Sequence, residues 1–202
     1  MKKFLILFIT LISYLGFSQT TSEIFDYKVM TFYGLDFTSA RCIGITEFPA
    51  SNEMINFYFQ EWNDLFMDQD NKYKIGKPYK KKKVDYDTMV FALNREINPD
   101  KLIIDKSYTL KKSEINDITK KYAKADKTGI GMVYIVEALN ANAEYLSIWI
   151  TFFQNSTGKV LLTEPLRRKG KGRRFGDYWE KAFIKLYMDS AYDYKAWSKI
   201  YK

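Results

Sequence analysis

The chain has 202 residues, of which 47% are hydrophobic and 17% aromatic, and its formal net charge is +8. This composition excludes disorder over most of the chain and provides enough apolar material for one domain of ordinary size. With no histidine and a single cysteine, Cys42, the chain excludes serine–histidine and cysteine–histidine catalysis, thiolate metal clusters and an intrachain disulfide.

The first 18 residues have the pattern of a secretory signal peptide. Lys2 and Lys3 precede an apolar run over residues 4–17, and Gly16 and Ser18 have the spacing that signal peptidase prefers. The run is shorter than the roughly 20 residues that a membrane-spanning helix needs. We therefore predict cleavage after residue 18 and a periplasmic or secreted single domain over residues 19–202. It is not expected to be a lipoprotein, because no cysteine follows the cleavage point.

The first part of the mature chain alternates strand and helix patterns. Residues 26–32 predict a strand that Gly34 ends, and residues 41–45 predict a second short strand. Beyond Pro49, apolar residues recur at helical spacing over residues 52–67, which predicts an amphipathic helix. We expect its aromatic stripe to belong to the core rather than to line a ligand site.

The middle of the chain is rich in lysine. Residues 70–87 carry seven lysines and predict a solvated loop. Residues 88–93 and 101–105 predict short strands, separated by a turn over residues 94–100 in which Asn98-Pro99-Asp100 supplies the turn chemistry.

A short helix and a buried strand are predicted next. The helix opens at Ser113, and Ile115, Ile118 and Tyr122 mark its buried face. Residues 132–139 are almost entirely apolar and β-prone, which indicates a strand covered on both faces.

A β-hairpin is the clearest local pattern. Hydrophobic alternation over residues 146–153 leads into the turn Asn155-Ser156-Thr157-Gly158, and a return strand over residues 160–163 is expected to end at Pro165.

A long final helix is predicted from Asp177 to about Tyr194, because Asp177 and Glu180 have capping-box spacing. Together the elements predict an α/β (α+β) fold, a mixed β-sheet with a C-terminal β-hairpin and three helices packed on it.

Two basic clusters are the candidate anion-binding sites. The first is the lysine run over residues 80–83, and the second lies within residues 167–174. The second cluster precedes the final helix and contains two glycines, which suits an anion held by backbone amides. Its spacing matches no phosphate-binding fingerprint, however, and Asp177 and Glu180 would repel an anion at that helix terminus. A solvated surface is the alternative for both clusters. The candidate residues are Lys80, Lys81, Lys82, Lys83, Arg167, Arg168, Lys169, Lys171, Arg173 and Arg174.

Two carboxylates stand out by their surroundings. Asp36 follows Gly34 in an aromatic stretch, and Glu137 lies within the apolar strand. Both are better explained as acceptors for backbone amides or a neighbouring lysine than as a catalytic pair. We assign no catalytic, metal-binding or cofactor-binding residue, and we expect Cys42 to be a small buried hydrophobe.

Three stretches carry a family resemblance: VMTFYGLDF over residues 29–37, VYIVEALN and LSIWITFFQNSTGKV within residues 133–160, and FGDYW over residues 175–179. Together they resemble a family of uncharacterised exported proteins of Gram-negative bacteria. The order of elements, with a hairpin turning at Thr157-Gly158-Lys159 and a closing helix, is also similar to the amino-terminal domain of TolB and to envelope domains of the CsgG type. This second resemblance implies an α/β envelope module that contacts other proteins, and neither resemblance supplies catalytic residues.

We therefore expect a non-enzymatic protein-interaction module of the cell envelope, monomeric or weakly associated, with an envelope protein as partner and no cofactor. The alternative is a binding protein for anionic lipid, lipopolysaccharide or acidic glycan that uses the basic clusters. A third possibility, a carboxylate-based hydrolase, requires a deep cleft with two converging acids. Nucleic acid is not expected as a partner of an exported protein.

Overall fold

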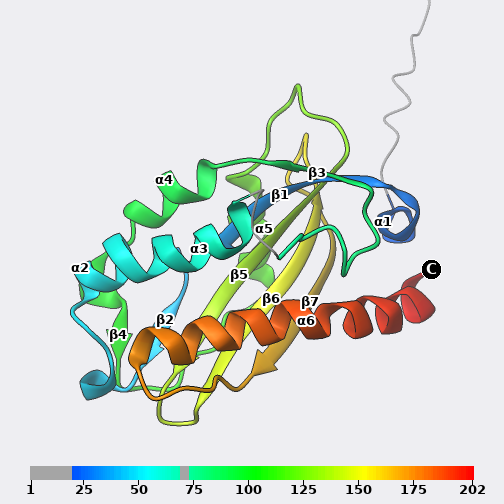
Figure 1. The fold of residues 1–202 in the computed structure, drawn as a ribbon. Coiled ribbons are helices and arrows are strands. Elements are labelled where there is room, and N and C mark those ends of the chain that lie inside the picture. Colours follow the sequence, from blue (N-terminus) through cyan, green and yellow to red (C-terminus); the bar gives the residue numbers. More distant parts are fainter. Residues whose placement is uncertain (1–19, 69–72) are drawn as a thin grey trace, which may run out of the picture.

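The computed structural model describes residues 20–68 and 73–202, so the predicted signal peptide lies outside the described residues. The described strands form one seven-stranded mixed sheet, with helices on both of its faces (Figure 1). This arrangement confirms the predicted α/β class.

Strand β5 (Ile130–Asn140) is the centre of the sheet and is buried in all but its last residue, as the apolar pattern predicted. One edge of β5 pairs antiparallel with β6 (Tyr145–Gln154), which pairs antiparallel with β7 (Val160–Arg168). The predicted hairpin is thus confirmed, but its return strand does not stop at Pro165. Because β7 pairs only with β6, a proline on its open edge removes no hydrogen bond from the sheet.

The other edge of β5 is shared by two parallel strands. Its first half pairs with β1 (Val29–Asp36) and its second half with β2 (Arg41–Ile43). β1 starts later than predicted and runs through Gly34, because a bulge between Phe32 and Leu35 accommodates the positive φ of 93° at that glycine.

Two short strands lie outside β1 and β2. β3 (Lys83–Tyr86) pairs with β1, so the predicted loop over residues 70–87 in fact contains a strand. β4 (Ile103–Ile104) pairs with β2 and is all that forms of the predicted strand over residues 101–105. Of the predicted turn over residues 94–100, the first two residues are helical, and the part at Asn98-Pro99-Asp100 is confirmed. There Asn98 Oδ1 accepts the amide of Asp100 at the start of a 3-10 helix (Pro99–Lys101).

One face of the sheet carries a helical run over residues 51–67 together with the final helix. The run consists of α2 (Ser51–Glu53), a π-helical segment (Met54–Tyr58) and α3 (Phe59–Met67). It enters after a 3-10 turn (Ile45–Glu47) and ends at the predicted residue. Its aromatic stripe is core, as expected, because Phe59 and Trp62 are almost fully buried.

The final helix, α6 (Phe175–Tyr201), is longer than predicted at both ends. Its N-cap is Arg174, without a side-chain cap bond, so the predicted capping-box start at Asp177 is wrong. Aromatic packing fixes α6 beside the earlier helices, since the Phe37 ring stacks on Phe59 at 3.9 Å between centroids and meets Phe183 edge-on at 6.0 Å.

The opposite face of the sheet is covered by α5 (Lys112–Lys120), which confirms the predicted short helix and its buried Ile115 and Ile118. In Figure 1 this helix lies behind the sheet. Where a strand was predicted over residues 88–93, the chain forms α4 (Met89–Arg95) instead. Asp87 Oδ1 accepts the Met89 amide at the start of this helix, which favours a helical turn over an extended chain.

Candidate functional site

The lysine cluster at residues 80–83 is not a single solvated surface. Lys81 is only 8% exposed, and its Nζ donates to the carbonyl oxygens of Ile24 and Tyr27 and to Tyr194 Oη at 3.2 Å. The expectation of a surface cation is therefore wrong for this residue. Its ammonium group joins the first helix, α1 (Glu23–Asp26), to the end of α6. The other three lysines are exposed.

The buried ammonium gives a prediction about pH. Burial lowers the pKa of Lys81 from 10.5 to about 8. Between pH 8 and 10 the unfolded chain keeps a proton that the folded chain has released, so the free energy of unfolding should rise with pH, by up to about 3 kcal/mol. Urea denaturation at pH 7.5, 8.5 and 9.5 measures this rise.

Lys81→Met should abolish the rise, whereas Lys82→Met, which alters an exposed neighbour, should preserve it. Above pH 10 the trend should reverse, because burial raises the pKa of Tyr79 and Tyr122 and their unfolded forms then lose protons first. If the urea midpoint of the unaltered protein stays constant or falls from pH 7.5 to 9.5, the lowered pKa of Lys81 is contradicted.

The second basic cluster begins in a strand rather than a loop. Arg167 and Arg168 are the last two residues of β7. Arg168 donates to Asp189 Oδ2 from Nε and to Asp193 Oδ2 from Nη2, each at 2.7 Å, so it clamps β7 to α6. The Arg167 guanidinium lies 4.8 Å from the centroid of the Tyr145 ring. Arg168 is therefore not a free ligand for an anion.

The remaining cations of this cluster are exposed. Lys169 Nζ lies 3.3 Å from Glu144 Oε2, and Arg174 Nε lies 3.1 Å from Asp177 Oδ2. Such exposed pairs contribute little and exchange easily with another anion. Lys171 and Arg173 form no ion pair within the described part of the chain.

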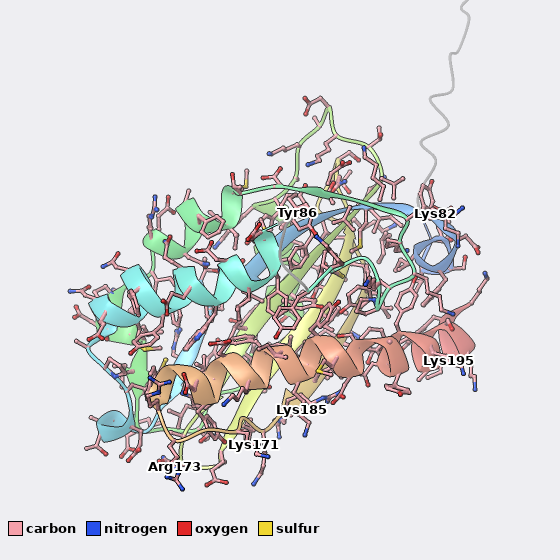
Figure 2. All side chains as sticks on the ribbon, viewed as in Figure 1. Lys82, Tyr86, Lys171, Arg173, Lys185 and Lys195 are labelled. Carbon is pink, nitrogen blue, oxygen red and sulfur yellow. The ribbon has the colours of Figure 1, made fainter. Side chains whose placement is uncertain are left out.

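The two clusters do not make one site. Lys81 contacts Tyr194 near one end of α6, whereas Arg174 precedes the other end. About 20 residues of helix separate these positions, which corresponds to roughly 30 Å. Figure 2 shows Lys82 at one end of the molecule and Arg173 at the other.

The exposed face of α6 supplies cations that the sequence analysis missed. Residues 167–202 hold 11 of the basic residues and 4 of the acidic ones, whereas residues 20–166 hold 19 basic and 20 acidic residues. The net positive charge of the described chain is thus confined to its last part. We call the following residues the cationic face: Lys169, Lys171, Arg173, Lys181, Lys185, Lys195 and Lys199. Several of them line the same side of α6 in Figure 2.

A shallow hollow of about 490 Å³ lies within the cationic face, between the loop after β7 and the first turns of α6. Its cationic lining residues are Lys169, Lys171, Lys181 and Lys185. Ile184 and Met188 add apolar surface to the lining, and Asp189 adds one carboxylate. We call it the basic hollow. It combines a mostly positive lining with apolar surface.

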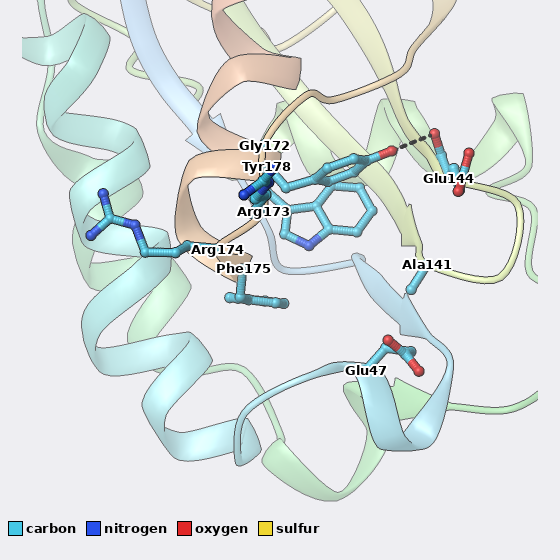
Figure 3. A pocket seen from close by; sticks show the side chains of 9 residues that line it. Glu47, Ala141, Glu144, Gly172, Arg173, Arg174, Phe175 and Tyr178 are labelled. Carbon is cyan, nitrogen blue, oxygen red and sulfur yellow. Dashed lines mark hydrogen bonds between the residues drawn. The ribbon is translucent and has the colours of Figure 1, made fainter.

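A second hollow, of about 300 Å³, opens at the start of α6 and is shown in Figure 3. Three aromatic side chains line it, Phe175, Tyr178 and Trp179, and Tyr178 Oη donates to the carbonyl oxygen of Glu144 at 3.0 Å. Glu47 and Arg173 add charges of both signs. We call it the aromatic hollow.

The start of α6 is acidic where it faces α3. A hollow of about 520 Å³ between α3 and α6 is lined by five carboxylates, Glu61, Asp64, Asp68, Asp177 and Glu180. Burial and the neighbouring Asp68 raise the pKa of Asp64. Asp177 and Glu180 thus hold negative charge at the first turn of α6, as expected. An anion is better placed on the cationic face than at this helix terminus.

The two carboxylates singled out in the sequence have structural partners. Asp36 accepts the amide of Thr38 and the hydroxyl of Tyr122, each at 2.7 Å. Glu137 accepts the amide of Leu110 at 2.8 Å and the hydroxyl of Ser147. Both carboxylates accept backbone amides, as the sequence analysis predicted for them.

The single cysteine is also structural. Cys42 is fully buried in β2, and burial raises the pKa of its thiol far above the usual range. This confirms the expected small buried hydrophobe.

Residues 20–68 and 73–202 contain no group of three or more acidic or cysteine side chains placed to hold a metal ion. None of the helices in these ranges combines the length and apolar character needed to cross a membrane. No protein-family model and no curated protein matches the chain.

Proposed function

We propose that the protein is a non-enzymatic, exported envelope protein that acts by binding polyanions on its cationic face. The observation that carries this proposal is the segregation of charge. Eleven basic residues oppose four acidic ones in residues 167–202, and four lysines of α6, at positions 181, 185, 195 and 199, are exposed without an ion pair in the described ranges.

Unpaired lysines favour binding because they need not leave another partner first. Each lysine close to an anionic surface contributes about 1 kcal/mol of attraction at moderate salt. A set of five to seven such groups therefore contributes about 5 to 7 kcal/mol, which corresponds to a dissociation constant between about 200 and 7 μM before any apolar contact is counted. Within the lysine cluster at residues 80–83, the ammonium group of Lys81 is engaged by Ile24 and Tyr194. Lys82 lies far from Lys171 and Arg173 (Figure 2).

The proposal is tested by a matched pair of charge reversals. Lys181→Glu/Lys185→Glu changes the cationic face, and Lys112→Glu/Lys121→Glu makes the same change of charge at exposed positions of α5 and the residue after it. We expect the α6 variant to lose at least about tenfold in affinity for lipopolysaccharide and for heparin at 50 mM NaCl, and the α5 variant to stay within about twofold.

Binding by the unaltered protein should weaken steeply between 50 and 300 mM NaCl. Equal losses from the two variants would mean that only the overall charge matters. An absence of binding at 50 mM NaCl would contradict the proposal directly.

A protein-interaction module with an envelope protein as partner is the second candidate function. The aromatic hollow favours it, because three aromatic side chains beside charges of both signs suit a peptide segment. The same experiments separate the two functions. One envelope protein cross-linked from position 173, with no binding of polyanions, would favour this second function.

A further inference from the structure

We propose that the outward face of α6 docks flat on an anionic lipid bilayer, with Met188 and Tyr192 entering the headgroup region between two pairs of lysines. This inference rests on the proposed function and names the source of the anionic groups as a membrane surface.

The first support is the order of residues along α6. Positions 181, 185, 188, 192, 195 and 199 are separated alternately by four and three residues, which places them in one line along a helix. Lysines occupy the two positions at each end of this line, and Met188 and Tyr192 occupy its centre. The line spans about 27 Å at the usual helical rise, which is wider than a single lipid headgroup.

The second support is the exposure of the two central side chains. Met188 is 65% exposed and Tyr192 is 78% exposed. A soluble polyanion would contact the lysines alone, so binding of a soluble polyanion does not explain why Met188 and Tyr192 are exposed between them. A bilayer presents anionic headgroups above an apolar interior, which matches lysines that flank methionine and tyrosine.

The third support is the way α6 is held. Its inward face is fixed to the sheet by the buried side chains Phe183, Leu186, Tyr194 and Trp197. The helix therefore presents its outer line without having to fold or detach on binding. The basic hollow continues the same surface, because Lys181, Lys185 and Met188 also line it.

The test uses a fluorescent reporter on the line. The only natural cysteine, Cys42, is fully buried, so Met188→Cys can be labelled selectively with an NBD dye. We expect NBD emission to shift to the blue and to increase about two- to fivefold on adding phosphatidylglycerol/phosphatidylethanolamine vesicles. Neither phosphatidylcholine vesicles nor heparin should produce this change.

The matched control is Asn116→Cys on α5, on the other face of the sheet, where the emission should not change with any vesicle. An equal change at both labelled positions would overturn the proposed orientation. A label at position 188 that stays silent with anionic vesicles would overturn the membrane inference.

A second variant separates the inference from the function on which it rests. Met188→Ser/Tyr192→Ser keeps all lysines, so heparin binding should be unchanged while vesicle binding falls about tenfold. If heparin binds and vesicle binding is unaffected by this variant, the membrane inference fails and the proposed function stands. If neither heparin nor vesicles bind the unaltered protein, both fail.

Discussion

Asn63→Ala is expected to lower the free energy of unfolding by about 3 kcal/mol. Asn63 is fully buried in α3, and its Oδ1 accepts the amide of Leu35 at 2.7 Å. Its Nδ2 donates to the carbonyl oxygens of Leu35 and Phe59, at 3.0 and 3.1 Å. The parallel pairing of β1 with β3 ends at Phe32. Beyond that point no described strand pairs with this edge of β1, and the Asn63 side chain bonds the amide and the carbonyl of Leu35 instead. Alanine leaves a buried amide without a partner.

Asn56→Ala is the matched control, because it removes the same amide group from an exposed position of the same helical run. Its effect should stay within about 0.5 kcal/mol. Guanidinium denaturation followed by circular dichroism measures both variants. Similar midpoints for the two variants would show that the Leu35 amide finds another partner. Asn94 is the nearest alternative, but its Oδ1 already accepts the amide of Phe37 at 2.8 Å.

The elements predicted correctly from the sequence are those whose signal is local. The β6–β7 hairpin and the amphipathic helices repeat apolar residues at the period of their own backbone, and β5 is a continuous apolar run. The apolar composition of β5 also predicts that both of its faces are buried, and ten of its eleven residues are in fact buried. These elements make up the mixed sheet and the helices packed on it.

The errors arise where a distant part of the chain decides the structure. Residues 88–93 look β-prone, but Val90 and Asn94 are both buried four residues apart on a helix beside β1. Lys81 lies in a run of four lysines, yet its partners Ile24 and Tyr194 are 57 and 113 residues away in the chain. No local pattern contains these partners. In both cases contacts with distant parts of the chain override what the local sequence pattern indicates.

The candidate site was predictable in part. The basic run before the final helix is evident in the sequence, but its first two arginines are held in a strand, and Arg168 is committed to two aspartates. The apolar periodicity that predicts α6 does not reveal the lysines on its outer face. The same periodicity applied to lysine finds positions 181, 185, 195 and 199 on one face.

Gly158→Ala is expected to lower the free energy of unfolding by about 3 to 4 kcal/mol. Gly158 closes the β6–β7 hairpin with a positive φ of 70°. A β-carbon there would lie 2.6 Å from Lys120 Cα and 2.7 Å from the carbonyl oxygen of Thr119, both backbone atoms at the end of α5. The end of α5 is also hydrogen-bonded to the turn, because Thr119 Oγ1 donates to the carbonyl oxygen of Gly158 at 2.7 Å. The helix cannot move away without breaking that bond.

Gly129→Ala separates the cost of backbone strain from the cost of the clash. Gly129 also has a positive φ, 87°, but a β-carbon there would meet no atom within 4 Å. Its substitution should therefore cost only the strain, about 1 kcal/mol. Urea denaturation of both variants should give a difference of at least about 2 kcal/mol, which measures the contact between the hairpin and α5. Equal losses would mean that α5 yields to the added methyl group. The turn would then not be what fixes this helix against the sheet.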